Sequence, residues 1–358
     1  MQSVIVGSNQ AGQRLDKFLR KRLPLAGGGF LYKMLRKKNI TLNGKRAEGG
    51  DMLSVGDEIC LFLSDETLAK FSGDGVLAGR ASGGKVSPTR VPGGERGEGG
   101  RAEEYGAAYR RLQGITVVYE DDDCIFLNKP AGILTQKAAP GDCSLNEWLA
   151  GYLLDRDASL LNDLPTFRPS VCNRLDRNTS GIVLCGKSLK GLQYLSACIK
   201  GRGIRKYYRT ICAGVLEEPA VLGGRLIKDT AKNRVEIIPE GAEAGKGSSP
   251  ICTVCRPIKV TEGYTLLEVE LITGKTHQIR AHLADMGHPL IGDAKYGMEP
   301  VNRALYGRFG LRHQLLHAYR VEFPPAGEGD GDIAERLGGR SFCAPYPALF
   351  LEIQKGLM

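Results

Sequence analysis

The sequence predicts an α+β protein made of a small basic unit, a glycine-rich connection and a larger domain of mixed strands and helices. From residue 115 onward, short β-type runs stand between amphipathic helices in an irregular order, which favours an α+β sheet over a doubly wound parallel one. Residues 12–63 combine two amphipathic helical patterns with short strand patterns, whereas residues 64–112 hold few large apolar groups. We therefore expect three parts, at residues 1–63, 64–112 and 113–358.

The N-terminal unit has the pattern of two helices followed by strands. Residues 13–20 place apolar side chains on one helical face and charges on the other, and residues 30–38 repeat this arrangement. Between them, Pro24 and the glycines at 27–29 interrupt the helical pattern. Asn43 and Gly44 form a strong turn signal after a short strand, and residues 53–63 supply a closing strand.

Positive charge is concentrated in this unit. The whole chain carries a formal net charge of +9, and residues 12–46 hold eleven Lys or Arg against one acid, Asp16, so the remainder is close to neutral. A concentrated basic face is typical of proteins that bind nucleic acid. The side chains expected to contact RNA here are Arg14, Lys17, Arg36, Lys37, Lys38, Lys45 and Arg46.

Residues 64–112 are predicted to be a flexible tether. They contain eleven glycines and mixed charges, a composition that buries too little apolar surface to offset the entropy of ordering. Such a tether keeps the basic unit at a high effective concentration near the larger domain.

In the larger domain, β-type runs and amphipathic runs are distinct. We expect strands at 116–119, 124–127, 181–185, 207–212 and 264–271, and helices at 145–154 and 189–198. Residues 240–249 and 324–339 are Gly-rich and are expected to form surface loops.

Cysteine usage and the lack of long apolar runs limit the class of protein to which the sequence can belong. Ten cysteines occur without framework spacing, several of them in apolar runs, which favours a reducing, cytoplasmic environment. Cys252 and Cys255 form a lone CxxC without a second pair at zinc-site spacing, and we expect no metal. No secretion signal, membrane span, dinucleotide fingerprint or P-loop is present in the sequence, so we expect no cofactor.

The most informative segment is 171–187. It presents one acid, Asp176, between Arg174 and Arg177 and directly before a turn at 178–181 that leads into an apolar strand. A carboxylate on a turn at the rim of a sheet is well placed to meet a substrate, and neighbouring cations favour its ionised, nucleophilic form. Taken alone, however, Arg-x-Asp-Arg is most often a solvated turn with surface ion pairs.

This segment resembles the signature of the RluA-type pseudouridine synthases, Arg-Leu-Asp followed by Thr-Ser-Gly. Further blocks of that family follow the same order: Leu127-Asn-Lys-Pro-Ala-Gly132, Arg205-Lys-Tyr-Tyr208, Thr273-Gly-Lys-Thr-His-Gln-Ile-Arg-Ala-His282 and Ile291-Gly-Asp-Ala-Lys-Tyr-Gly297. The resemblance covers residues 115–323 and implies a mixed, largely antiparallel sheet with flanking helices and a central cleft. Residues 12–63 resemble the small αL RNA-binding motif first named for a ribosomal small-subunit protein, although glycines replace its usual Ser-bearing start of the second helix.

The resemblance implies the chemistry of pseudouridine formation, in which uracil is detached from its ribose, turned and rejoined through ring carbon 5. By resemblance, Asp176 is the nucleophile, either adding to the anomeric carbon or first helping to eliminate the base. Tyr208 is expected to stack on the base and assist proton removal. Arg280 is expected to pair with the carboxylate. Tyr207 alternates with Tyr208 along the strand and should face the other side of the sheet.

The same resemblance implies further RNA contacts. Because the target base must leave the stack, Arg174 is expected to support base extrusion. Arg177 and Lys275 are also expected to contact RNA. Lys129 is expected to touch a phosphate, and His277 and Gln278 to shape the site or touch RNA. Asn173 and Lys275 depart from the His and Arg common in the family, which predicts altered RNA contacts or packing.

Three classes of function remain open at the level of sequence. The leading hypothesis is an RNA pseudouridine synthase acting on large-subunit ribosomal RNA or a pre-ribosomal particle, with transfer RNA as the alternative substrate. A non-catalytic RNA-binding or assembly factor with the same fold is the second class, and a nucleoside hydrolase is the third, although a hydrolase has no use for a basic unit. We expect a monomer.

Overall fold

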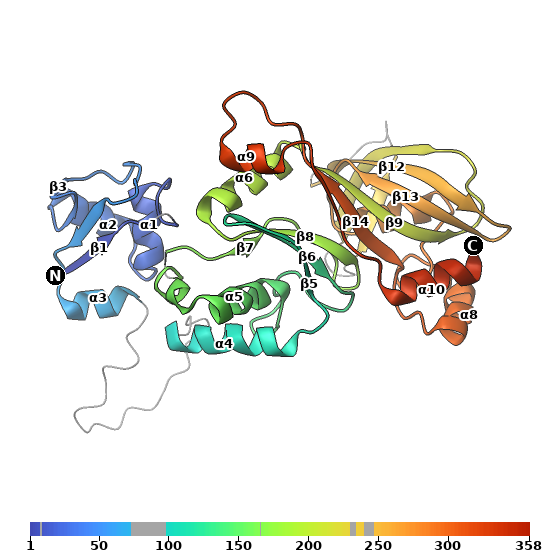
Figure 1. The fold of residues 1–358 in the computed structure, drawn as a ribbon, viewed down its shortest axis with the longest axis horizontal. Coiled ribbons are helices and arrows are strands. Elements are labelled where there is room, and N and C mark those ends of the chain that lie inside the picture. The colour runs from blue at the N-terminus through green and yellow to red at the C-terminus, as the bar shows by residue number, and fades with distance from the viewer. Residues whose placement is uncertain (8, 73–97, 165, 230–233, 240–246) are drawn as a thin grey trace, which may run out of the picture. The chain divides into compact units, whose positions relative to one another are not determined.

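The computed structural model describes residues 1–7, 9–72, 98–164, 166–229, 234–239 and 247–358 (Figure 1). The chain divides into two compact units. The first comprises residues 1–113 with 146–170 and 186–193, and the second comprises 114–145, 171–185 and 194–358. None of the helices in the described residues is both long and apolar enough to span a membrane.

The first unit contains a four-stranded antiparallel sheet. Its strands are β1 (Gln2–Ile5), β2 (Ile40–Leu42), β3 (Lys45–Arg46) and β4 (Glu58–Leu61), in the order β1-β4-β2-β3. Asn43 and Gly44 both have positive φ, 51° and 71°, as a tight turn between β2 and β3 requires. The turn predicted from Asn-Gly is therefore present.

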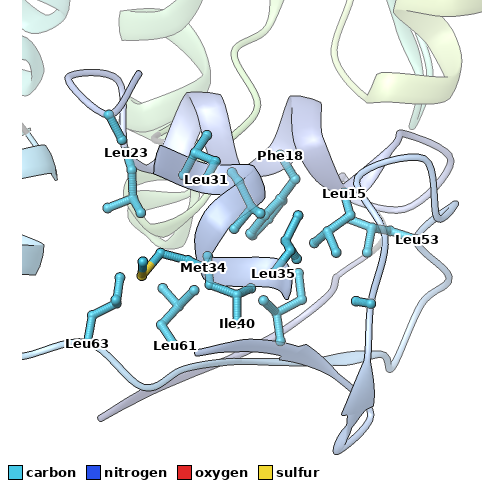
Figure 2. Close-up of a cluster of buried hydrophobic side chains, with 14 of the residues drawn as sticks. Leu15, Phe18, Leu23, Leu31, Met34, Leu35, Ile40, Leu53, Leu61 and Leu63 are labelled. Atoms are coloured by element: carbon cyan, nitrogen blue, oxygen red, sulfur yellow. The ribbon is translucent and has the colours of Figure 1, made fainter. Parts of the chain in front are cut away.

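Two helices, α1 (Leu15–Arg22) and α2 (Gly28–Arg36), supply the core above this sheet. Figure 2 shows their apolar side chains gathered with those of the strands in one buried cluster. The helical faces predicted from the sequence are confirmed, and α2 begins at Gly28, two residues earlier than expected. Because the apolar faces point inward, the cations named above as RNA contacts are exposed: Arg14, Lys17, Arg36, Lys37, Lys38, Lys45 and Arg46.

The predicted tether contains helices at both of its described ends. Helix α3 (Asp65–Ser72) packs Phe71 against Phe30, with 4.5 Å between ring centroids. Helix α4 (Glu98–Arg111) places Tyr109 against Trp148 of α5 (Leu145–Arg156) at 5.6 Å. A flexible segment over all of 64–112 was the wrong expectation here, because a few aromatic anchors order the chain although its average composition is poor in apolar groups. The central part of the predicted tether, residues 73–97, lies outside the described residues.

The second unit is built on an eleven-stranded sheet in the order β11-β10-β12-β13-β9-β14-β8-β6-β5, with β15 beside β14 and β7 beside β8. Figure 1 shows β12, β13, β9 and β14 side by side. The paired registers are antiparallel except for β14 with β8, which is parallel. The strands are β5 (Thr116–Glu120), β6 (Cys124–Lys129), β7 (Ser170–Val171), β8 (Ser180–Gly186), β9 (Arg205–Ala213), β10 (Ala220–Asp229), β11 (Arg234–Ile238), β12 (Ser249–Val260), β13 (Tyr264–Leu271), β14 (Leu316–Glu322) and β15 (Ser341–Cys343).

This sheet confirms the predicted fold class, a mixed and largely antiparallel α+β architecture with flanking helices. The five strands expected from short β-type runs are β5, β6, β8, β9 and β13, and the two expected helices are α5 and α6 (Leu189–Lys200). The remaining helices are η1 (Ala158–Asn162), α7 (Gln278–Asp285), α8 (Glu299–Phe309), α9 (Asp332–Leu337) and α10 (Ala348–Leu357). Helix α9 lies inside the loop predicted at 324–339, because Ile333 and Leu337 pack into a buried cluster with β6, β8 and β14.

His317 of β14 gives the second unit a specific sensitivity to acid. The side chain is fully buried, and its Nδ1 shares a hydrogen bond with Ser180 Oγ at 2.8 Å. Burial lowers the pKa of His317 to about 4, whereas a histidine in an unfolded chain titrates at about 6.5. Between these values the unfolded state binds more protons, so this residue removes about 1.4 kcal/mol of stability for each pH unit that the pH falls.

We expect His317→Gln to lessen the acid-induced loss of unfolding free energy by about 3 kcal/mol between about pH 7 and pH 4. Urea denaturation of both proteins across this range measures the two slopes. Above neutral pH both side chains are uncharged, so the difference between the proteins should not vary there. Parallel stability curves down to the acid limit would contradict the assignment.

Candidate active site

Asp176 lies in the loop between β7 and β8, and hydrogen bonds fix the main chain on both sides of it. Thr135 Oγ1 donates to Leu175 O (2.8 Å) and accepts from Leu175 N (3.2 Å). Gly132 N donates to Arg177 O at 2.9 Å. The side chain of Asp176 is 24% exposed, so its carboxylate is held in place and remains accessible to a substrate.

The side chain of Lys129 stabilises this loop through a hydrogen bond to its main chain. Its ammonium is buried and donates to Pro130 O and Ile133 O (both 2.9 Å) and to Arg177 O (3.0 Å). Burial lowers the pKa of Lys129 to about 7, and the negative charge of Asp176 opposes that shift. The phosphate contact predicted for Lys129 is wrong, because the ammonium is enclosed and its donors already have partners.

Arg280, on α7, joins two carboxylates. Its Nη1 donates to Asp176 Oδ2 at 3.1 Å, while Nε and Nη2 donate to Asp293 Oδ2 and Oδ1 at 2.6 Å and 2.8 Å. Asp293 is fully buried, and the Arg280 side chain is nearly so. The bidentate pair with Asp293 sets the plane of the guanidinium, so the third nitrogen is directed at Asp176.

The buried carboxylate of Asp293 has further donors. The backbone amides of Lys295 and Tyr296 both donate to Oδ1, at 2.9 Å and 3.1 Å. Burial alone would raise the pKa of Asp293, but the hydrogen bonds and charge of Arg280, together with these amides, hold it below its usual range. Asp293 is therefore the ionised anchor of Arg280.

His277 lies beside the carboxylate of Asp176, with Nε2 3.9 Å from Oδ2. It precedes α7 with a left-handed backbone, φ 55°, a conformation that costs free energy in a residue other than glycine. Burial lowers the pKa of His277, and Asp176 opposes the shift. The imidazole is therefore mainly neutral at neutral pH, so one ring nitrogen carries a proton and the other is an acceptor.

The hydrogen bonds of Tyr296 indicate which nitrogen carries that proton. Tyr296 Oη accepts from Val235 N at 2.8 Å and lies 3.1 Å from His277 Nδ1. One lone pair of the Tyr296 oxygen is occupied by the bond from Val235 N, and the hydroxyl proton is available for donation to His277 Nδ1. This arrangement favours the tautomer whose Nε2–H points toward Asp176.

Tyr208 and Tyr207 occupy neighbouring positions of β9 and face opposite sides of the sheet. Tyr207 Oη donates to Glu322 Oε2 at 3.2 Å, and the Arg320 guanidinium lies 4.2 Å from its ring centroid. Tyr208 is 6% exposed, and burial, followed by the negative charge of Asp176, raises the pKa of its phenol. Of the two tyrosines, Tyr208 is therefore the one whose pKa is affected by the charge of Asp176.

The Thr-Ser-Gly turn after Asp176 serves packing. Gly181 has φ 116°, and a Cβ at this position would lie 2.2 Å from Ala318 O of β14. Thr179 and Ser180 are buried, and Ser180 bonds His317 as described above. The turn therefore seats the Asp176 loop against β14.

The remaining predicted RNA contacts divide into exposed and buried groups. Arg174, Arg177 and Lys275 are exposed. Gln278 is buried and hydrogen-bonds inside the protein, with Thr273, Lys275 N, Cys252 O and Thr253. A direct RNA contact by Gln278 is excluded by this burial, whereas the alternative prediction, that Gln278 shapes the site, agrees with its bonds.

Asn173, which stands where His is common in the family, has an internal partner. Its Oδ1 accepts from Leu184 N at 2.7 Å, and its Nδ2 donates to Ile182 O at 3.4 Å. The departure is thus accommodated in the packing of the loop against β8.

Sequence reasoning assigned no role to Asp293 or Tyr296. Both belong to the block 291–297, which we used only as a sign of resemblance. The available signal was that Asp293 lies in a short run between Gly292 and Gly297. Its partner, Arg280, is thirteen positions away in the sequence. The sequence does not show that this loop folds back on α7.

Comparisons with known proteins show what the chain is similar to. A sequence profile described as RNA pseudouridylate synthase matches residues 123–285. The ribosomal large subunit pseudouridine synthase C of Vibrio cholerae serotype O1 is 28% identical over 340 residues, covering 92% of this chain and 90% of that protein. The protein of the same name from Escherichia coli K12 is 28% identical over 339 residues, covering 91% and 90%.

Solved structures share the fold. Human RNA pseudouridylate synthase domain containing 4 matches with a TM-score of 0.55 at 18% identity, covering 71% of this chain and 97% of that chain. Human RNA pseudouridylate synthase domain containing 1 matches with a TM-score of 0.50 at 20% identity, covering 66% and 85%.

The sheet and the matched segment together define an RNA-modifying isomerase. The chain matches the RNA pseudouridylate synthase profile over residues 123–285, in agreement with the resemblance to RluA-type synthases found in its sequence.

Replacing the buried anchor should destabilise the second unit. Asp293→Asn leaves the guanidinium of Arg280 without its buried counter-charge, so we expect a loss of about 3–5 kcal/mol in unfolding free energy. Urea denaturation measures this loss. Asp285→Asn, an exposed change on the same α7, is the matched control and should alter stability by less than about 0.5 kcal/mol. Equal stability of the two variants would contradict the anchoring role.

Removing the Tyr296 hydroxyl should release the tautomer of His277. In Tyr296→Phe, Nδ1 loses its donor, and we expect the Nε2–H form to give way to a mixture of tautomers. The ring ¹⁵N chemical shifts of His277 distinguish the two forms. Tyr32→Phe, which removes a hydroxyl bonded to Asp16 in the first unit, serves as control. Unchanged His277 shifts in Tyr296→Phe would show that another group sets the tautomer.

Proposed function

We propose that this protein converts uridine to pseudouridine in large-subunit ribosomal RNA, with Asp176 as the nucleophile. The match to the RNA pseudouridylate synthase profile supports the reaction, and the names of the relatives, which align with nearly the whole chain, support the substrate. The observation that carries the proposal is the carboxylate of Asp176, accessible on its outer side and held by an arginine that is itself anchored on a buried acid.

The two oxygens of Asp176 have different environments. Oδ2 accepts from Arg280 and faces His277. Among the residues that the structure describes, none donates a hydrogen bond to Oδ1. In either proposed route, addition to the anomeric carbon or removal of the neighbouring sugar proton, Oδ1 is therefore the oxygen that acts, while Arg280 retains Oδ2.

The uracil then leaves the sugar with the electrons of the glycosidic bond, turns, and bonds to the anomeric carbon through carbon 5. In the addition route the ester to Asp176 breaks as this bond forms, and in the elimination route the proton taken from the sugar is returned to it. The carboxylate released from the sugar can then accept the proton of carbon 5. Tyr208 supplies an aromatic surface for the turning base. Because its phenol has a raised pKa, it remains protonated at neutral pH. This favours stacking and hydrogen-bond donation over action as a phenolate base.

RNA recognition is divided in this proposal between the two units. Arg174, exposed two residues before Asp176, is placed to occupy the vacancy left by the extruded base, since a guanidinium stacks and donates several hydrogen bonds. Arg177 and Lys275 are also exposed and would meet phosphates. The exposed cations of α1, α2 and β3 make residues 1–63 the proposed RNA-binding domain, and residues 113–358 the proposed catalytic domain.

Asp176→Asn should abolish isomerisation while leaving RNA binding intact. The amide has nearly the shape of the carboxylate but lacks its nucleophilic charge, so we expect a fall in rate of roughly 10³-fold or more. Tritium release from RNA labelled at uracil carbon 5 measures turnover, with large-subunit ribosomal RNA and transfer RNA in parallel. A filter-binding assay measures affinity.

Asp285→Asn is the matched control and should retain wild-type turnover. Release from transfer RNA alone would replace the proposed substrate. Comparable release by Asp176→Asn would remove Asp176 from the nucleophilic role. Binding by the wild-type protein without release from either RNA would favour the non-catalytic RNA-binding factor instead.

A further inference from the structure

A cavity lies beside Asp293, the residue that anchors Arg280. It has a volume of about 470 Å³, within the range of roughly 300–1,000 Å³ that is typical of small-ligand sites. Helix α8 forms one wall, and the segments around residues 292–294 and 311–312 form the others. The side chains that line it include Arg303, Tyr306, Leu311 and Arg312.

The walls combine an aromatic surface with a cation. Tyr306 is 51% exposed although it is a large aromatic residue. The guanidinium of Arg312 lies 5.5 Å from its ring centroid. Leu311 is buried and packs close to Gly292, where a Cβ would lie 2.8 Å from Leu311 Cδ2 and 2.3 Å from His313 O. The floor is therefore close-packed, and the aromatic and cationic groups border the opening.

Four of the residues that line the cavity are charged, the acids Asp293 and Glu299 and the cations Arg303 and Arg312. Asp293 is paired with Arg280. Arg303 forms an ion pair with Glu299, and Arg308 donates to Gly356 O at 3.0 Å. Arg312 is exposed and forms no ion pair with any residue that the structure describes, so it is available to an anion at the cavity.

Two connections join this cavity to Asp176. Asp293, which contributes to the cavity wall, holds Arg280 and through it Asp176. Arg312 is followed closely by Gln314, whose Nε2 donates to Thr179 Oγ1 at 3.4 Å, in the turn directly after Asp176. The cavity therefore shares residues and neighbouring segments with the framework that holds Asp176.

We propose that this cavity binds a nucleotide of the substrate RNA that flanks the target uridine, with its base stacked on Tyr306 and its phosphate paired with Arg312. The proposal rests on the proposed function, because extrusion of the target base unstacks its neighbours and leaves them available. An aromatic ring beside a cation is the combination that binds single-stranded RNA, since every base has a face to stack and every nucleotide has a phosphate. The site selects an unstacked nucleotide rather than a particular base.

The test is binding of two single-stranded probes, a heptamer of uridylate and a heptamer of the same ribose-phosphate backbone without bases, measured by fluorescence anisotropy. Tyr306→Ala should weaken binding of the uridylate by roughly 5- to 100-fold and leave binding of the abasic probe unchanged. Tyr306→Phe, which keeps the ring, should bind like the wild type. Arg312→Gln should weaken binding of both probes and lower the slope of log affinity against log salt by about 0.7.

Leu351→Ala and Lys355→Ala are matched controls on α10. Leu351 is an apolar side chain of the same 51% exposure as Tyr306, and Lys355 is an exposed cation; neither lines the cavity. Both control variants should bind the two probes as the wild type does. Wild-type binding by Tyr306→Ala, or an equal loss for both probes, would overturn the base-stacking site.

Tritium release separates this proposal from the isomerase itself. With ribosomal RNA, Tyr306→Ala should raise KM and leave kcat near the wild-type value, because the stacked nucleotide positions RNA without touching the reacting atoms. A fall in kcat without a change in KM would contradict the site. Absence of release by the wild-type protein, with the anisotropy result intact, would refute the proposed reaction and leave the nucleotide site standing.

Discussion

The site depends on one interaction, the bidentate pair between Arg280 and the buried Asp293. An unpaired arginine in this environment would be costly, and a single link to the partly exposed Asp176 could not fix its orientation. With two of its nitrogens committed to Asp293, the guanidinium has one direction left for Nη1. The position of the proposed nucleophile, Asp176, is thus determined through Arg280 by the buried Asp293, a residue that need not touch the substrate.

Segments remote in sequence must meet before this arrangement exists. Asp176 and Arg280 are 104 positions apart, and Ser180 and His317 are 137 apart. The sheet brings them together because β14 lies between β9 and β8, pairing antiparallel with one and parallel with the other. Gly181 permits the close approach of β8 to the backbone of β14. The same strands that form the core therefore place the loop of Asp176 opposite α7.

The fold class and several residues of the candidate site could be predicted from sequence, because short β-type runs and short motifs are local properties. The alternation of Tyr207 and Tyr208 is of this kind. Lys129 was misjudged because its burial depends on three carbonyl groups from two separate segments. Asp293 was missed for the same reason, and α3 was missed because Phe71 has its aromatic partner in another helix. What sequence reasoning lacked in each case was a tertiary contact.

The parallel pairing of β14 with β8 also has a consequence for biosynthesis. Chains emerge from the ribosome N-terminus first, and domains fold as their residues become available. The core of the first α1–α2 unit is complete by residue 72, whereas the Asp176 loop lacks its supporting strand until β14, ending at Glu322, has emerged. A nascent chain can therefore carry a folded basic surface, beside ribosomal RNA, well before the loop of Asp176 has its supporting strand.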